Sequence, residues 1–85
     1  MYTKLDVWRQ NYAPGRPDQL SVGDFIECEN YEAKRSFQAE LLGIASGNYD
    51  ANILIALLGK ERLLKHGSWE EWARLMLLWL ANYKK

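Results

Sequence analysis

The sequence SWEEWARLMLLWLANYKK, from Ser68 to Lys85, is the stretch that decides the fold expected of this chain. Ser68 and Glu71 have the spacing of a capping box, in which the serine side chain and the glutamate side chain each bind a backbone N–H of the first helical turn. Glu70 and Glu71 suit the positive end of a helix dipole, and Lys84 and Lys85 suit its negative end. The stretch therefore predicts a capped α-helix.

Large apolar side chains recur along this expected helix at intervals of three and four residues, and no residue from Leu75 to Ala81 is polar. A helix that is apolar on every side must be covered on every side. Either the rest of the chain wraps it, or a second chain covers part of it. We favour the second interpretation, because tryptophan and tyrosine are common interface anchors. The expected interface consists of Trp69, Trp72, Leu75, Met76, Leu78, Trp79 and Tyr83, with Trp72, Met76 and Trp79 at its centre.

The preceding stretch, from Asp50 to Gly67, predicts another helix with a strongly apolar face. Asp50 is a suitable N-cap, and Gly67 is a suitable terminator. Gly59 lies inside this stretch, where glycine costs about 1 kcal/mol relative to alanine. Either another backbone comes close at Gly59, or the helix breaks there. Because only Gly67 and Ser68 join this stretch to the last helix, the two should pack as an αα-hairpin.

The first twelve residues predict an N-terminal arm. Leu5, Trp8 and Tyr12 share one helical face, and Thr3 is a possible cap. A short strand is the alternative, because apolar and polar residues also alternate near Leu5. Residues 13–20 contain two prolines and a glycine and should form a linker between the arm and the body.

The expected helical body covers residues 21–85, and Ser21 is a possible cap at its beginning. The apolar residues from Val22 to Ile44 recur with roughly helical period, interrupted at Glu29 and Asn30. Gly47 suits the left-handed backbone conformation that often follows the last residue of an α-helix. We expect one all-α domain of three to four helices, with a C-terminal αα-hairpin. The alternative is an α+β fold with a short strand or hairpin from residues 3–8 and 22–28.

Composition narrows the class of function. Eleven basic and eleven acidic residues among 85 give zero net charge, so the overall field attracts neither nucleic acid nor anionic membrane. The longest unbroken apolar run has seven residues, whereas a membrane span needs about 20. Residues 1–6 have no apolar run behind their lysine, so we expect no signal peptide. These features predict a cytoplasmic protein without a membrane segment.

Catalytic and metal-binding patterns are weak. The chain has one cysteine, Cys28, and one histidine, His66, whereas a zinc site needs three or four ligands. Four carboxylates lie close in sequence, and we interpret them as a solvated face rather than as acid–base or cation-binding groups; they are Asp24, Glu27, Glu29 and Glu32. We therefore expect that the protein is not an enzyme and that it binds neither a cofactor nor a metal.

The leading hypothesis is a small non-enzymatic protein that acts by protein–protein contact, as a homodimeric regulator, adaptor or assembly subunit. Its partner would be another protein or a second copy of itself. The alternative is a nucleic-acid-binding regulator that uses Lys60, Arg62 and Lys65. That alternative is weaker, because Glu70 and Glu71 would face phosphates in a helix-turn-helix arrangement.

Overall fold

A computed structural model describes residues 2–83, and this part of the chain forms six α-helices and no strand. The helices are α1 (Thr3–Asn11), α2 (Asp18–Cys28), α3 (Tyr31–Ala45), α4 (Ala51–Leu58), α5 (Lys60–His66) and α6 (Trp69–Asn82). The all-α class is confirmed, but the expectation of three to four helices is too low. Residues 3–8 and 22–28 are helical, so the α+β alternative is wrong. The expected dipole partners Lys84 and Lys85 lie outside the described residues.

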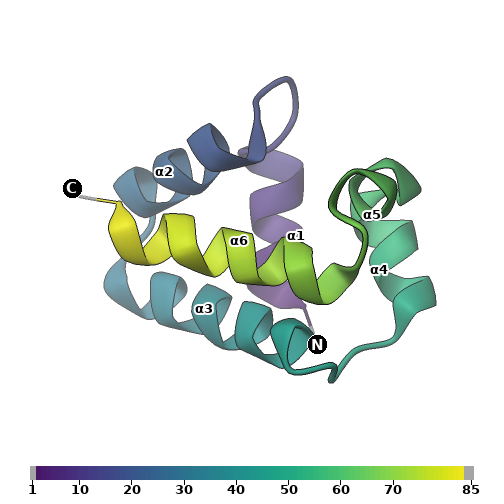
Figure 1. Cartoon of the computed structure of the whole chain (residues 1–85). Helices are drawn as coiled ribbons and strands as arrows, with labels where there is room; N and C mark the ends of the chain where they lie inside the picture. The colour runs from purple at the N-terminus through teal and green to yellow at the C-terminus, as the bar shows by residue number, and fades with distance from the viewer. Residues whose placement is uncertain (1, 84–85) are drawn as a thin grey trace.

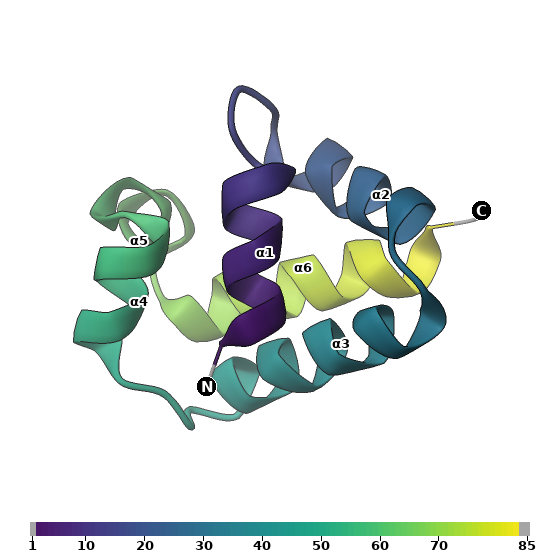
Figure 2. The same ribbon diagram turned by 180° about the vertical axis from the view of Figure 1, so that it is seen from behind.

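Helix α6 lies at the centre of the arrangement. It runs beside α3 along most of its length, and it also contacts α2 and α5. Figure 1 shows α6 in front with α3 beside it, and Figure 2, the view from behind, shows α1 in front, where it crosses α6 and reaches the end of α3. Helices α4 and α5 close one end of the molecule. The expected packing of α5 against α6 through the short Gly67–Ser68 link is therefore present.

Aromatic rings from four helices meet in the core. Trp8 of α1 lies 6.0 Å from Phe37 of α3, measured between ring centroids, and 6.2 Å from Trp72 of α6. Phe25 of α2 lies 4.7 Å from Phe37. Trp8, Phe25, Phe37 and Trp72 are all completely buried. The N-terminal segment is thus an integral part of the core, and each of these rings removes a large apolar area from water.

The start of α1 is capped from another helix. We expected Thr3 to be the cap, but Thr3 is already helical and the N-cap position, Tyr2, makes no side-chain cap bond. Instead the Glu40 carboxylate of α3 accepts hydrogen bonds from the backbone N–H groups of Lys4 at 3.0 Å and Leu5 at 2.9 Å. A carboxylate at this position also suits the positive end of the helix dipole.

Helix α2 begins earlier than the sequence indicated. Asp18 is its first residue and Pro17 occupies the N-cap position, so the linker is shorter than the expected 13–20. Ser21 is buried inside the first turn rather than capping it. Its hydroxyl donates to the carbonyl groups of Pro17 and Asp18, which explains how a polar side chain is accommodated there.

Several expected helix ends are confirmed. Asp50 accepts a hydrogen bond from the backbone N–H of Asn52 at 2.9 Å, and Ser68 accepts one from that of Glu71 at 3.1 Å. Gly47 follows α3 with a φ of +85°, in the left-handed region that favours glycine. These ends depend on residues close in sequence, so local patterns predicted them.

Gly59 separates α4 from α5. Its φ is +94°, and a Cβ added there would meet nothing within 4 Å. Of the two expectations for Gly59, the break is therefore confirmed and the close approach of another backbone is wrong. The glycine is required by its backbone conformation, since L side chains rarely adopt this φ.

The two glycines Gly59 and Gly43 should respond in opposite ways to substitution by alanine. Gly59→Ala is expected to lower the free energy of unfolding by about 1 kcal/mol, because alanine is strained at positive φ. Gly43→Ala is expected to raise it by about 0.5–1 kcal/mol, because Gly43 lies inside α3 and its added Cβ would make only an ordinary contact, at 3.8 Å. Urea unfolding of both variants measures these changes in the free energy of unfolding. A Gly59→Ala variant as stable as the original chain would contradict the assignment.

Candidate functional site

The structure corrects part of the interface expected on the last helix. Trp72 and Met76, two of its three central anchors, are completely buried in the chain's own core, and Trp69 is 1% exposed. Helices α1, α2, α3 and α5 leave these three side chains no surface for a second chain. The prediction overestimated the uncovered part of α6, because it assumed that so few helices could not surround it.

A narrower apolar surface remains on α6. Leu75 and Trp79 are half-buried, Leu78 is 54% exposed, and Tyr83 is exposed at the end of the helix. Leu20 of the adjacent helix α2 is also 54% exposed. We call these five residues, Leu20, Leu75, Leu78, Trp79 and Tyr83, the outer strip.

Helices α2 and α6 are joined at the outer strip. The Tyr83 ring lies against Gly23 so closely that a Cβ there would come within 2.8 Å of it. The Tyr83 hydroxyl donates to Glu27 at 3.0 Å, and this bond raises the pKa of the tyrosine above its ordinary value. Beside Tyr83, a hollow of about 370 Å³ is lined by Trp79 and by Gln19 of α2. Tyr83 therefore joins α6 to α2 at one end of the outer strip.

Two of the charges that flank the outer strip on α6 form an exposed ion pair. Arg74 and Glu71 are joined at 2.6 Å, and their side chains are 58% and 62% exposed. A pair so exposed contributes at most about 1 kcal/mol to stability. Its two charges cancel, so this side of α6 has no strong electrostatic preference for a charged partner.

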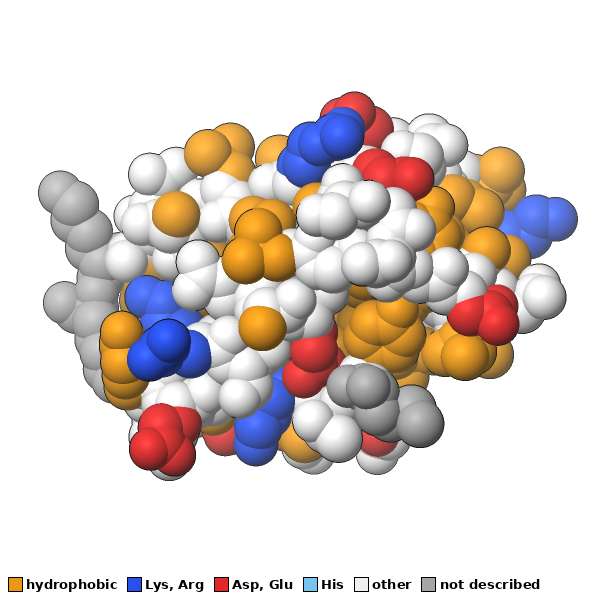
Figure 3. All heavy atoms as spheres, turned by 90° about the horizontal axis from the view of Figure 1, so that it is seen from below, with side chains coloured by type: hydrophobic (Ala, Val, Ile, Leu, Met, Phe, Trp, Pro, Cys, Tyr) orange, Lys and Arg blue, Asp and Glu red, His pale blue; other side chains and the backbone are white. Residues whose placement is uncertain are grey.

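A second group of hydrophobic side chains lies at the α4 end of the molecule, on the right in Figure 3, where orange side chains gather. Tyr2, Ile53 and Leu57 line a small apolar hollow of about 230 Å³ there. Ile53 is 47% exposed. The sequence analysis did not name these residues as a surface, because it expected the apolar residues of both segments to be buried in the core.

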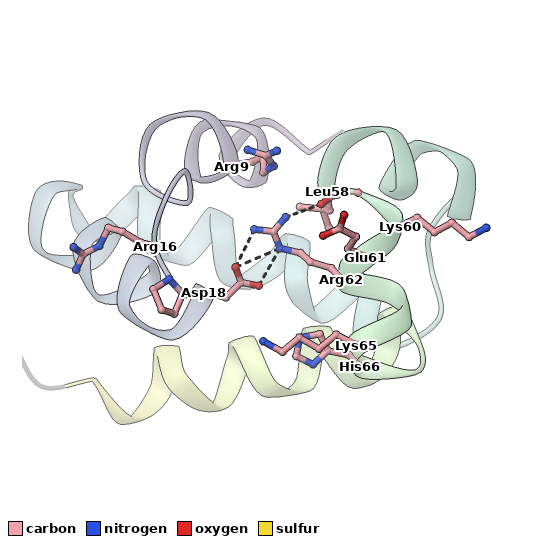
Figure 4. Close-up of a pocket in the computed structure, with 11 residues that line it drawn as sticks. Arg9, Arg16, Asp18, Leu58, Lys60, Glu61, Arg62, Lys65 and His66 are labelled. Atoms are coloured by element: carbon pink, nitrogen blue, oxygen red, sulfur yellow. Dashed lines mark hydrogen bonds and ion pairs between the residues drawn. The ribbon is translucent and has the colours of Figure 1, made fainter.

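The basic residues named in the alternative hypothesis surround a larger cleft, with a volume of about 630 Å³, between α1 and α5. Figure 4 shows that they do not form one basic surface, because Lys60 points away from the cleft and Lys65 points along it. Arg62 lies between them and is paired with Asp18 of α2 at 2.9 Å. Sequence reasoning missed Asp18, since 44 residues separate it from Arg62.

The Asp18 carboxylate has several donors. Arg62 donates to it from Nε at 3.0 Å and from Nη2 at 2.9 Å, and the indole N–H of Trp72 donates at 3.0 Å. The Arg62 guanidinium also lies 5.5 Å above the centre of the Trp8 ring, at a distance that favours a cation–π interaction. Both charged side chains are mostly buried, with exposed fractions of 21% for Arg62 and 14% for Asp18.

The electrostatic state of Asp18 follows from these contacts. Burial alone raises the pKa of the carboxyl, but the hydrogen bonds from Arg62 and Trp72 and the charge of Arg62 together hold the pKa below its ordinary value. The folded state thus favours the carboxylate form of Asp18. The indole N–H groups of Trp8 and Trp69 are buried without a partner in the described part of the chain, so Trp72 is the buried tryptophan whose orientation a hydrogen bond fixes.

The acidic residues near α2 do not converge on one point. Asp24 pairs with Arg16 at 2.6 Å, Glu27 accepts from Tyr83, and Glu29 accepts from Tyr12 at 2.5 Å. The Glu29 bond, together with burial, raises the pKa of the tyrosine to about 12. Among residues 2–83, no group of three His, Cys, Asp or Glu side chains has an arrangement that could hold a metal ion.

Comparison with known proteins places the chain in no family, because no family model, curated protein or solved structure matches it. Within the described residues, none of the helices is both long enough and apolar enough to span a membrane. The outer strip and the cleft are therefore the two candidate sites.

Substitution of Asp18 by asparagine should weaken the fold in a pH-dependent way. Because the folded-state pKa of Asp18 is lowered, its charge contributes stability that is fully present above the unfolded pKa of about 4 and is lost as pH falls through the folded value. At pH 7, Asp18→Asn is expected to cost about 3 kcal/mol, since it leaves Arg62 without its counter-charge. Thermal melts at pH 7 and at about pH 3 measure the difference between the two chains, which should shrink at the lower pH.

Asp24→Asn is the matched control, because Asp24 pairs with Arg16 while both side chains are 40% or more exposed. Its cost should stay below about 1 kcal/mol. Equal losses for the two variants, or a loss at Asp18 that does not depend on pH, would contradict the assigned role of Asp18.

Proposed function

We propose that this protein acts without catalysis, through contact between protein surfaces, as a homo-oligomeric regulator, adaptor or assembly subunit. The supporting observation is the outer strip, where Leu20 and Leu78 are each 54% exposed on two helices packed side by side. Single exposed leucines are common on monomers, whereas several large apolar residues along one seam are typical of a contact surface.

The partner proposed for the outer strip is a second copy of this chain. The chain has zero net charge, so two copies do not repel each other through their overall fields. Of the charged neighbours of the strip, Glu71 and Arg74 neutralise each other, and Glu27 is hydrogen-bonded to the Tyr83 hydroxyl. A two-fold arrangement would bring the same patch of both copies together, and such a patch must be compatible with itself. The apolar side chains of the strip meet this requirement.

The expected association is weak. About 400 Å² of apolar burial would contribute about 10 kcal/mol, and the costs of association consume about 4–15 kcal/mol. Stable complexes commonly bury about 1,600 Å² in total, which is more than a single helical seam offers. With the smallest of these costs, about 6 kcal/mol remains, so the dissociation constant should lie at about 10⁻⁴ M. This strength suits a partner that is exchanged rather than permanent.

Nucleic-acid binding gains no comparable support, because Arg62 is paired with Asp18 and Lys60 points away from Lys65. A cytoplasmic location is part of the proposal and rests on the sequence expectation alone.

Replacement of Leu78 by glutamate should abolish self-association, because a carboxylate would then have to be buried without a partner in the contact. Sedimentation velocity between about 5 and 500 µM should show the original chain shifting toward a dimer, while Leu78→Glu stays monomeric. The melting temperature of Leu78→Glu at low concentration should stay close to that of the original chain, since Leu78 lies outside the core.

Leu42→Glu is the matched control. Leu42 lies on α3 and is 50% exposed, so its substitution changes charge and exposure in the same way without touching the outer strip. This variant should associate as the original chain does. A strictly monomeric original chain over the whole concentration range, or equal losses for the two variants, would refute the proposal.

A further inference from the structure

The cleft between α1 and α5 is strongly basic for a chain without net charge. Its lining contains five cationic side chains and two carboxylates, a formal excess of three positive charges. Its volume of about 630 Å³ lies within the range of about 300–1,000 Å³ that is usual for small-molecule sites. More than half of the described chain lies between α1 and α5 in sequence, so only the fold brings these charges together.

The cationic side chains of the cleft differ in what already engages them. Arg62 is paired with Asp18, and Arg16 is paired with Asp24 at 2.6 Å. Figure 4 shows Arg16 and Lys60 pointing out of the cleft in opposite directions. The remaining two, Arg9 of α1 and Lys65 of α5, line the cleft from two different helices.

Arg9 and Lys65 have no carboxylate within ion-pair distance among residues 2–83. The Nε of Arg9 is in addition covered by protein and has no hydrogen-bond partner in the same residues. Arg9 follows the fully buried Trp8, so the start of its side chain is fixed in place by the core. A positioned guanidinium without a partner is an available binding group for an anion.

We propose that this cleft binds a small molecule that carries two or more phosphate groups, with Arg9 and Lys65 as the binding cations. A guanidinium matches the geometry of phosphate oxygens with two parallel hydrogen bonds, and a lysine ammonium adds a compact charge. Two cations on different helices favour a ligand whose charges are spread over several groups. The site is separate from the outer strip and does not depend on self-association.

The phosphate groups, rather than an attached base, are the part recognised. The described lining contains no Trp, Tyr or Phe on which a nucleobase could stack. Asp18 does not oppose the ligand strongly, since its charge is compensated by Arg62 and by the indole N–H of Trp72.

Calorimetric titration of the full chain with tripolyphosphate at low salt tests the proposal. One site per chain is expected. Arg9→Gln and Lys65→Gln should each weaken binding by about tenfold or more, because each removes one charge-assisted contact. Lys34→Gln combined with Arg35→Gln on α3 is the control, since it removes two positive charges outside the cleft, and it should change binding by less than about twofold. Circular dichroism melts establish that all variants are folded.

Further ligands separate phosphate recognition from its alternatives. Inorganic phosphate should bind more weakly than tripolyphosphate, and ATP should bind no more tightly than tripolyphosphate. Equal binding of citrate, or equal losses for the control variant, would overturn the proposal in favour of unspecific anion attraction. Binding of ATP or duplex DNA without binding of tripolyphosphate would also overturn it, because the base or the duplex would then be the part recognised. Lys65 is exposed, so its variant decides the question even where Arg9→Gln fails to fold.

Discussion

The ion pair between Asp18 and Arg62 holds together parts of the chain that are far apart in sequence. Asp18 opens α2, Arg62 belongs to α5, and the Trp72 indole of α6 binds the same carboxylate. Trp8 of α1 lies beneath the guanidinium. Charges removed from water stabilise a fold only when their hydrogen-bonding groups are matched, and here the donors come from two other helices. The pair therefore links four helices, and both of its residues line the basic cleft.

The break at Gly59 belongs to the same arrangement. In an unbroken helix, the Leu58 carbonyl would accept a hydrogen bond from the backbone N–H of Arg62, four residues later. After the break, Nη1 of the Arg62 side chain donates to that carbonyl at 2.6 Å. The Arg62 side chain thus donates a hydrogen bond to a carbonyl at the end of α4 and also neutralises the charge of Asp18. The positive φ of Gly59 turns α5 away from the axis of α4, and this turn brings Arg62 to Asp18.

Local features of the fold were predictable from the sequence, whereas the partners of the central helix were not. The caps Asp50 and Ser68 act on residues two or three positions away, so their pattern is visible in the sequence. The apolar pattern of α6 shows that it needs cover but does not say which chain supplies it, and Trp72 was therefore misassigned to an interface. Asp18 and Glu40 bind groups 35 or more residues away, and no local pattern indicates such partners.

Binding at the outer strip would depend on apolar burial, whereas binding at the cleft would depend on electrostatic attraction. The two should therefore respond differently to salt. Apolar contact is strengthened by salts that are excluded from the protein surface, such as sulfate. Attraction of an anion to Arg9 and Lys65 is screened, because the Debye length falls from about 30 Å at 0.01 M to about 8 Å at 0.15 M salt. The two surfaces also lie on different helices, with Leu78 on α6 and the free cations on α1 and α5. Ligand binding and self-association are therefore expected to be independent, unless the ligand disturbs the Asp18–Arg62 pair that both α2 and α6 depend on.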